Sequence, residues 1–232
     1  MELAVFNHHR FAFYYWIRWN LDKQIRPDLI SFDWHQDLAY PEEEDKKELR
    51  NLDANNPFEV SFFSWARLNS LNDNHIMSAV YLNLLRNVYV VCKQSSFDEY
   101  EDEEFLDFQG TKHFIRKFKD SQSLCAAVEQ EQINDVYFDI DLDYFTIENS
   151  STNDKQRFTY MNQKQINEIF NPSGELMKWI FKRIQGFTIA LEPEHTGGVE
   201  KSLRFLVLLE KLLFTKSIGN WENDWKRSEV IL

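Results

Sequence analysis

Short apolar runs alternate with longer amphipathic stretches along the chain. The apolar runs are largely continuous, as in strands covered on both faces, and predict strands within residues 2–9, 28–37, 88–92, 135–145 and 187–198. Apolar positions at helical spacing predict helices within residues 10–21, 57–72, 75–87, 123–132, 162–171, 173–185 and 198–214. The polar stretch 41–56 predicts a short helix, and the acidic segment 97–108 predicts a loop before a strand within 111–120.

Strands that alternate with helices in this way are typical of an α/β fold. The expected architecture is a three-layer α/β/α sandwich with a mostly parallel central sheet. We find no internal repeat and no compositional break, so the sequence predicts a single domain over residues 1–232. The 36 aromatic residues, 20 Phe, 9 Tyr and 7 Trp, supply enough apolar surface for a substantial core.

The net charge bears on the class of binding partner, and the cysteines bear on the cellular compartment. The formal net charge of −12 argues against nucleic acid, because phosphate binding needs a basic surface, and it favours cationic ligands. Cys92 and Cys125 are expected to be small buried hydrophobic residues in a reducing compartment. The sequence shows no signal peptide and no apolar run long enough to span a membrane, so we expect a cytoplasmic protein.

Polar side chains follow four of the predicted strands. Because ligands gather at the carboxyl ends of parallel strands, we expect these side chains to meet at one edge of the sheet. The residues are Asn7, His8 and His9; Asp33, His35 and Asp37; Asp139, Asp141 and Asp143; and Glu192, Glu194 and His195.

Carboxylates and imidazoles gathered in this way need cations among them. The set suits Mn²⁺ better than a thiolate-seeking metal, with Mg²⁺, Fe²⁺ or Zn²⁺ as alternatives. It contains enough ligands for two ions, and a pair of ions generates hydroxide near neutral pH. Either acidic motif alone occurs in proteins without metal, but both motifs at the ends of separate strands favour a metal site.

Two motifs resemble those of the arginase/deacetylase superfamily. "FDWHQD" resembles its D-x-H-x-D motif and "YFDIDLD" its later D-x-D motif, in the same order and with a similar separation. The blocks "HHRFAFYYW", "NDNHIMSAV" and "PEHTGG" are similar to the branch of peptide arginases that modify ribosomally made peptides. The resemblance implies an arginase-like catalytic domain.

The resemblance also implies a set of metal ligands. The first of two Mn²⁺ ions would be held by His9, Asp33, Asp37 and Asp139, and the second by His35, Asp33, Asp139 and Asp141. Asp33 and Asp139 would bridge the two ions, and Asp143 would support only the loop. His9 is preferred to the adjacent His8 because of its spacing to the aromatic helix.

The implied reaction converts arginine side chains of a precursor peptide to ornithine with release of urea, through a hydroxide between two Mn²⁺ ions. Asp37 would hydrogen-bond the hydroxide and pass on its proton, and His75 or His195 would shuttle protons. The substrate guanidinium would pair with Glu194, or with Glu192, because alternation along an extended strand puts both on one face. Gly197 and Gly198 would let the backbone approach the substrate, and Asn74 completes the expected substrate-binding set.

One difference from arginases that act on free arginine favours a peptide substrate. "LAYPEEEDKKELRNLD" follows the D-x-H-x-D motif in place of the polar Ser/Thr/Asn-rich loop that grips the free amino acid. The chain is also shorter than those enzymes, which suggests a more open mouth. The oligomeric state stays open.

Three alternatives remain at this point. A zinc deacetylase of the same fold would need one metal, whereas the additional acids Asp37 and Asp141 favour two. Another amidine hydrolase would act on a small molecule. A non-catalytic member would bind a peptide, but a charged cluster without a function is costly to keep folded.

Overall fold

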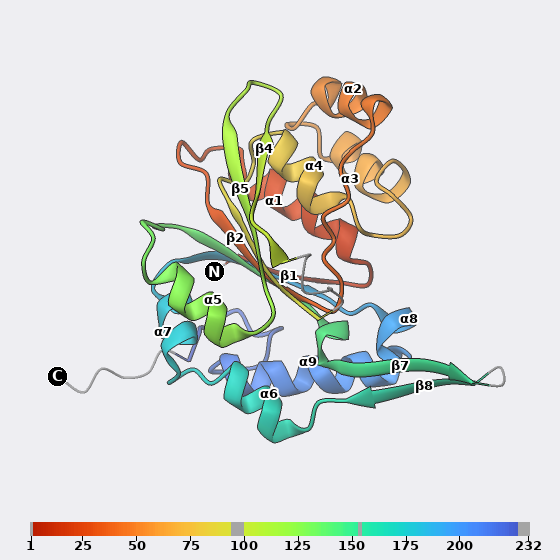
Figure 1. The fold of residues 1–232 in the computed structure, drawn as a ribbon, viewed down its shortest axis with the longest axis vertical. Coiled ribbons are helices and arrows are strands. Elements are labelled where there is room, and N and C mark those ends of the chain that lie inside the picture. The colour runs from red at the N-terminus through yellow and green to blue at the C-terminus, as the bar shows by residue number, and fades with distance from the viewer. Residues whose placement is uncertain (1, 94–99, 153–154, 227–232) are drawn as a thin grey trace.

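The computed structural model describes residues 2–93, 100–152 and 155–226, and it confirms an α/β architecture (Figure 1). A seven-stranded sheet has the order β1-β9-β6-β2-β3-β5-β4, and every neighbouring pair is parallel except β4 with β5. The strands are β1 (Leu3–Phe6), β2 (Asp28–Asp33), β3 (Val88–Cys92), β4 (Glu103–Leu106), β5 (Lys112–Phe118), β6 (Val136–Asp141) and β9 (Ile184–Ala190).

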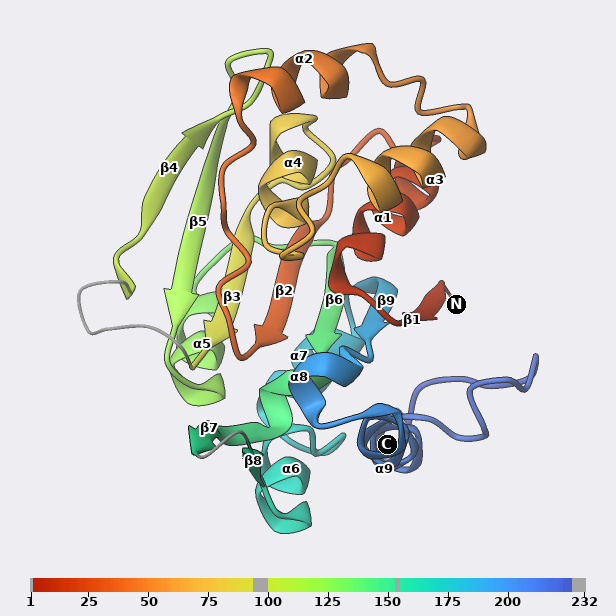
Figure 2. The same cartoon turned by 90° about the vertical axis from the view of Figure 1, so that its right-hand side faces the viewer.

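Helices cover both faces of this sheet, as a three-layer sandwich requires (Figures 1 and 2). One face is covered by η1 (His9–Phe11), α1 (Ala12–Asn20), α2 (Glu43–Asn51), α3 (Pro57–Ala66) and α4 (His75–Tyr81). The other is covered by α5 (Ser121–Val128), η3 (Leu142–Phe145), α6 (Gln163–Ile169), α7 (Glu175–Phe181) and α9 (Val199–Leu213). The short helix α8 (Pro193–Thr196) follows β9.

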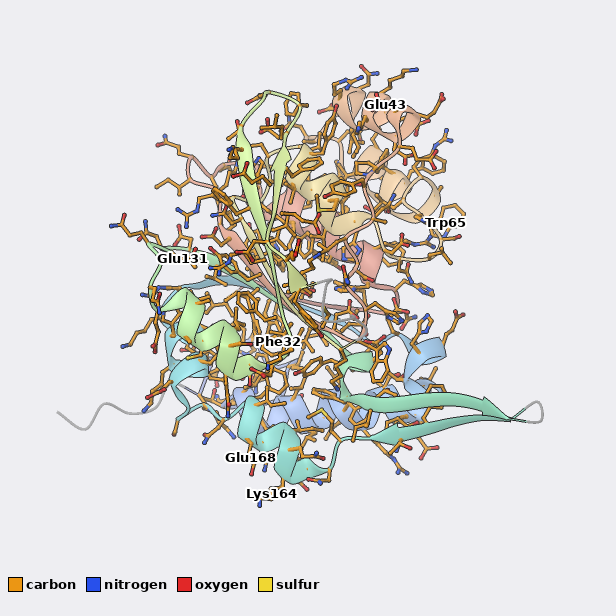
Figure 3. The ribbon with its side chains drawn as sticks, in the orientation of Figure 1. Phe32, Glu43, Trp65, Glu131, Lys164 and Glu168 are labelled. Atoms are coloured by element: carbon orange, nitrogen blue, oxygen red, sulfur yellow. The ribbon has the colours of Figure 1, made fainter. Side chains whose placement is uncertain are left out.

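The central strands are apolar because both of their faces are packed. Every residue of β2, β3 and β6 is buried. Phe32 of β2 lies at the centre of the molecule, where it packs edge-on against Phe138 and Tyr144, while the charged side chains of Glu43 and Lys164 lie at the surface (Figure 3). These contacts fix the strands whose ends carry the acidic motifs.

Three local predictions were incomplete or wrong. The acidic segment expected to be a loop contains β4, an edge strand, which tolerates acidic residues because its outer edge faces water; residues 94–99 lie outside the described part. A two-stranded hairpin, β7 (Thr146–Thr152) with β8 (Lys155–Tyr160), was missed, because its polar sequence gives no buried-strand pattern. Cys92 is buried as expected, whereas Cys125 is only partly buried.

The four strands that end in polar residues are consecutive in the sheet. β1, β9, β6 and β2 are neighbours and all run in the same direction, so their carboxyl ends lie along one edge. The predicted convergence of these strand ends is therefore confirmed. None of the helices in the described ranges is both long and apolar enough to cross a bilayer.

Candidate metal centre

His9 lies at the centre of the polar cluster. It begins the 3₁₀ turn that follows β1 and is fully buried. Its Nδ1 atom lies 2.8 Å from Asp37 Oδ2, 3.2 Å from Asp33 Oδ2 and 3.4 Å from Asp141 Oδ2. One imidazole nitrogen therefore faces three carboxylate oxygens, each from a different carboxylate. His8 is only half-buried and lines the cavity above, so His9 is the histidine that the fold brings to the acids.

Two groups of three ligand atoms share Asp33. In each group the ligand atoms lie within 4.8 Å of one another. We call His9, Asp33 and Asp141 the inner group, and Asp33, His35 and Asp143 the outer group. The shared carboxylate places Asp33 in the position expected of a bridging ligand, and both groups can hold a metal ion.

His75 and Asp37 complete the inner side of the cluster. With His9 they form a further group of ligand atoms within the same 4.8 Å limit. The His75 ring lies 4.3 Å from the His9 ring, centroid to centroid, and stacks on Trp16 at 5.7 Å. Its Nδ1 atom is 2.8 Å from the carbonyl oxygen of Asn72. His75 has no exposed surface and does not line the cavity, which does not fit a proton shuttle that exchanges with solvent.

The acidic motif of β6 is placed differently from the prediction. Asp139 belongs to neither group; it lies below them and accepts hydrogen bonds from Ser31 Oγ (2.8 Å) and Thr188 Oγ1 (2.5 Å). Asp143, expected only to support the loop, belongs to the outer group, where its Oδ2 lies 3.1 Å from His35 Nδ1. The acids that meet Asp33 are thus Asp141 and Asp143. The prediction was Asp139 and Asp141, so each acid lies two residues further along the chain than expected.

The clustered aspartates are buried and lie close to one another. Among the described residues, no lysine or arginine forms an ion pair with the five clustered aspartates; their ion-pair partners are histidines. Burial, with the charges of Asp37 and Asp143, raises the pKa of Asp33 well above its ordinary value. Burial, with the charges of Asp143 and Asp33, does the same to the pKa of Asp141. Both carboxylates therefore favour an added cation.

The histidines respond to the same field. Burial alone would lower the pKa of His9, but the charge and hydrogen bond of Asp139, with the nearby carboxylates of Asp33 and Asp37, raise it well above the ordinary value. Burial also opposes protonation of His35, yet Asp143 raises its pKa to about 9. The acids therefore favour the protonated form of each ring, just as they would favour a bound metal ion.

A cavity of about 1440 Å³ opens above the outer group. Acidic residues outnumber lysines and arginines in its lining, where Arg10 and Lys93 are the arginine and lysine residues from the described part of the chain. The acidic lining residues are Asp37, Asp73, Glu103, Asp141, Asp143, Glu192 and Glu194. The cavity exceeds the typical range for small-ligand pockets, roughly 300–1,000 Å³.

Glu192 and Glu194 do not share one extended strand, contrary to the prediction. β9 ends at Ala190, Glu192 adopts a left-handed conformation (φ 38°), and Glu194 lies in α8. Glu192 is buried, and its Oε1 accepts hydrogen bonds from the His9 backbone N–H (2.6 Å) and from Asn72 Nδ2 (2.9 Å). Glu194 is exposed at the cavity wall. Of these two glutamates, only Glu192 therefore hydrogen-bonds to a residue of the inner group, the backbone of His9.

Of the remaining residues predicted to contact substrate or shuttle protons, one lines the cavity and two have structural roles. His195 lines the cavity with its ring 5.5 Å from that of His35. Asn74 is buried away from the cavity, and its Oδ1 accepts a hydrogen bond from the backbone N–H of Asn69. Gly197 has φ 87°, and a side chain there would collide with Tyr160. The glycine therefore serves the packing of α8 on β8 rather than close approach to a substrate.

Sequence reasoning missed four polar residues of the site. Ser31 and Thr188 sit inside apolar strands; Ser31 lies two residues before Asp33 in β2, and that spacing was the only signal for it. Asn72 begins the block "NDNHIMSAV" but was given no role, and Lys93 follows β3 without a motif. Lys93 Nζ binds the carbonyl oxygens of Tyr144 and Thr146, and thereby holds the turn that carries Asp143; the backbone N–H of Trp34 donates to Asp143 Oδ1 at 3.0 Å.

The donor atoms of both groups fit a divalent cation. They are carboxylate oxygens and imidazole nitrogens without a thiolate, and Asp33 Oδ2 is buried with no hydrogen-bond partner. Such a set suits Mn²⁺, Mg²⁺ or Fe²⁺. The chain matches no protein-family model, and no curated protein matches it, so membership of the arginase/deacetylase superfamily stays a prediction carried by the motifs.

Proposed function

We propose that this protein is a divalent-metal-dependent hydrolase that converts arginine side chains within peptides to ornithine and urea. One observation carries the proposal: carboxylates and imidazoles from neighbouring parallel strands meet beneath a large acidic cavity. Among the described residues, no lysine or arginine forms an ion pair with these acids, and their partners are histidines, which can also ligate a metal ion.

Two Mn²⁺ ions are the best fit to the ligand groups. His9, Asp33 and Asp141 would hold the first ion, with Asp37 beside it, and Asp33, His35 and Asp143 would hold the second. Bound divalent ions supply a nucleophile near neutral pH by lowering the pKa of water. Asp37 is buried among the first ion's ligands and retains its role as the acid that accepts the nucleophile's proton and delivers it to the leaving amine.

Glu192 is the proposed partner of the substrate guanidinium. It lies at the cavity floor beside His9, and burial raises its pKa, so an arriving planar cation would relieve an unfavourable buried charge. Glu194, at the exposed wall, would contact flanking groups of the substrate. The sequence favoured Glu194 over Glu192 as the partner of the guanidinium, and this proposal reverses that preference.

The dimensions of the cavity support a peptide rather than free arginine. Its volume of about 1440 Å³ leaves room for main chain on both sides of a bound side chain. The acidic wall suits a cationic peptide, as the net charge of the chain also does.

The test is direct. The protein with Mn²⁺ and a panel of arginine-containing peptides should give urea and a mass loss of about 42 Da per modified arginine, the difference expected of urea-forming hydrolysis. Glu192→Gln should lose this activity. Glu168→Gln, the same acid-to-amide change at the exposed surface of α6, is its control and should act like the wild type.

Other outcomes would separate the alternative functions. Turnover of acetyl-lysine peptides with one ion per chain would favour a deacetylase, and turnover of free guanidino compounds alone would favour a small-molecule amidine hydrolase. Ion and peptide binding without any product would leave a binding protein. Unchanged peptides across the whole panel would rule out the proposed reaction.

A further inference from the structure

A row of three polar residues crosses the sheet directly beneath the inner group. Ser31 of β2 is in register with Asp139 of β6, and Asp139 is in register with Thr188 of β9. All three are completely buried, although their neighbours along each strand are apolar. A buried carboxylate in a parallel sheet is costly unless every lone pair is used, so this row needs an explanation.

Asp139 uses both of its carboxylate oxygens within the protein. Oδ1 accepts from Thr188 Oγ1 at 2.5 Å, and Oδ2 accepts from Ser31 Oγ at 2.8 Å. Oδ2 also lies 2.6 Å from His9 Nε2. With these donors in place the carboxylate is satisfied, and Asp139 belongs to none of the ligand groups found among the described residues. The contacts do not suit the bridging ligand that the motif predicted.

The contact with His9 determines which ring nitrogen faces the cluster. A histidine that binds a metal ion is neutral, and with its Nε2–H donated to Asp139 such a ring would keep its lone pair on Nδ1. Nδ1 is the atom that lies within 3.4 Å of the oxygens of Asp33, Asp37 and Asp141. The carboxylate thus sets both the orientation of the ring and its tautomer.

We propose that Asp139 is a positioning residue, which acts through His9 to present the Nδ1 lone pair to a metal ion in the inner group. Ser31 and Thr188 hold the carboxylate in place. This inference rests on the metal site of the proposed function, but it concerns ion binding and not the reaction. It assigns the buried row a role distinct from the ligands above it.

Ion binding tests the inference. Wild type, Asp139→Asn and Asp139→Ala are titrated with Mn²⁺ by calorimetry. Loss of a partner behind a ligating histidine costs about 10- to 100-fold in metal affinity, so we expect that loss at one site while the other site keeps its affinity. Thr188→Val, which keeps the shape of the side chain and removes one donor to Asp139, should cost less than about tenfold.

A spectroscopic readout separates positioning from simple loss of stability. In protein with ¹⁵N-labelled histidine loaded with diamagnetic Zn²⁺, His9 should show a slowly exchanging Nε2–H resonance. Asp139→Ala should remove this resonance, and Thr188→Val should retain it. Thermal unfolding of each variant establishes that the compared proteins are folded.

The possible results distinguish the two proposals. Unchanged affinity in both Asp139 variants would overturn the inference, and equal loss of both ions in a folded variant would restore Asp139 as a bridging ligand. A wild type that binds two ions but releases no urea would overturn the proposed function and leave the inference intact. A wild type that binds no divalent ion would overturn both.

Discussion

The inner and outer groups differ in their access to solvent. The inner group has His9 at its centre with no exposed surface, held by Asp139 from below and by the Glu192 contact to its backbone. The outer group has His35, whose side chain is 37% exposed, facing the cavity and His195. Both groups share Asp33.

This difference indicates separate tasks for two similar ligand sets. The inner group suits an ion that stays bound, because hydrogen bonds from neighbouring residues hold its ligands in place before the ion arrives. An accessible set suits an ion that faces substrate and exchanges with solvent. The comparison leads to four predictions, from the largest expected effect to the smallest.

Asp33→Ala should remove ion binding from both the inner and the outer group, because it removes the one ligand that the two groups share. We expect loss of both ions and no detectable turnover. The loss of metal affinity should exceed the roughly 10- to 100-fold cost of removing a residue that only supports a ligand. Metal analysis of the protein after gel filtration measures the ions retained per chain. An Asp33→Ala protein that retained two ions would show that Asp33 does not bridge.

His9→Ala and His35→Ala should affect different ions. Loss of His9 should remove the tightly held ion, whereas loss of His35 should remove the one that exchanges readily. Competition with a chelator, followed over time, separates a slowly released ion from a rapidly released one. Identical release curves for the two variants would contradict the contrast between the groups.

Glu192→Gln and Glu194→Gln compare a buried acid at the cluster with an exposed acid on the cavity wall. Loss of the Glu192 charge should lower kcat/KM about 100-fold or more, in the range seen when one preorganised contact at the reacting group is removed. Loss of Glu194 should cost less than about fivefold, because exposed ion pairs contribute only about 0.2–1 kcal/mol. Steady-state rates with one arginine peptide decide the order; a larger effect at Glu194 would reverse the assignment.

Stability without metal should depend on pH over the range of the histidine shifts. Folding raises the pKa of His35 from 6.5 to about 9, and that of His9 also rises, so the stabilisation by these protons is complete below pH 6.5 and is lost as pH rises through the folded values. The raised pKa values of Asp33 and Asp141 act in the same direction.

We therefore expect the Tm of the chelator-treated protein to fall between pH 6.5 and 9. Each kcal/mol corresponds to about 2–4 °C for a chain of this size, so the fall should be a few degrees. Mn²⁺ should reverse it, because the ion replaces the lost protons. Differential scanning calorimetry with and without Mn²⁺ tests this; a metal-free Tm that rises with pH would contradict the sign of the shifts.

The sequence was sufficient for the layers and for the edge of the sheet at which the acids meet. Continuous apolar runs specified β2, β3 and β6, and their parallel alternation with helices required that the polar strand ends share one edge. It was insufficient for β4 and for the β7–β8 hairpin, because an edge strand and an exposed hairpin lack the continuous apolar pattern of a buried strand.

The sequence by itself determined which residue types converge: imidazoles and carboxylates at the ends of adjacent strands. Only the tertiary structure decided which of Asp139, Asp141 and Asp143 reach Asp33, and that Glu192 rather than Glu194 lies beside His9. The physical reason is that residues two apart on a strand face the same way, so spacing alone cannot distinguish them. Strand register places Asp139 level with Ser31 and Thr188, one repeat below the cluster, and the left-handed turn at Glu192 redirects the chain after β9.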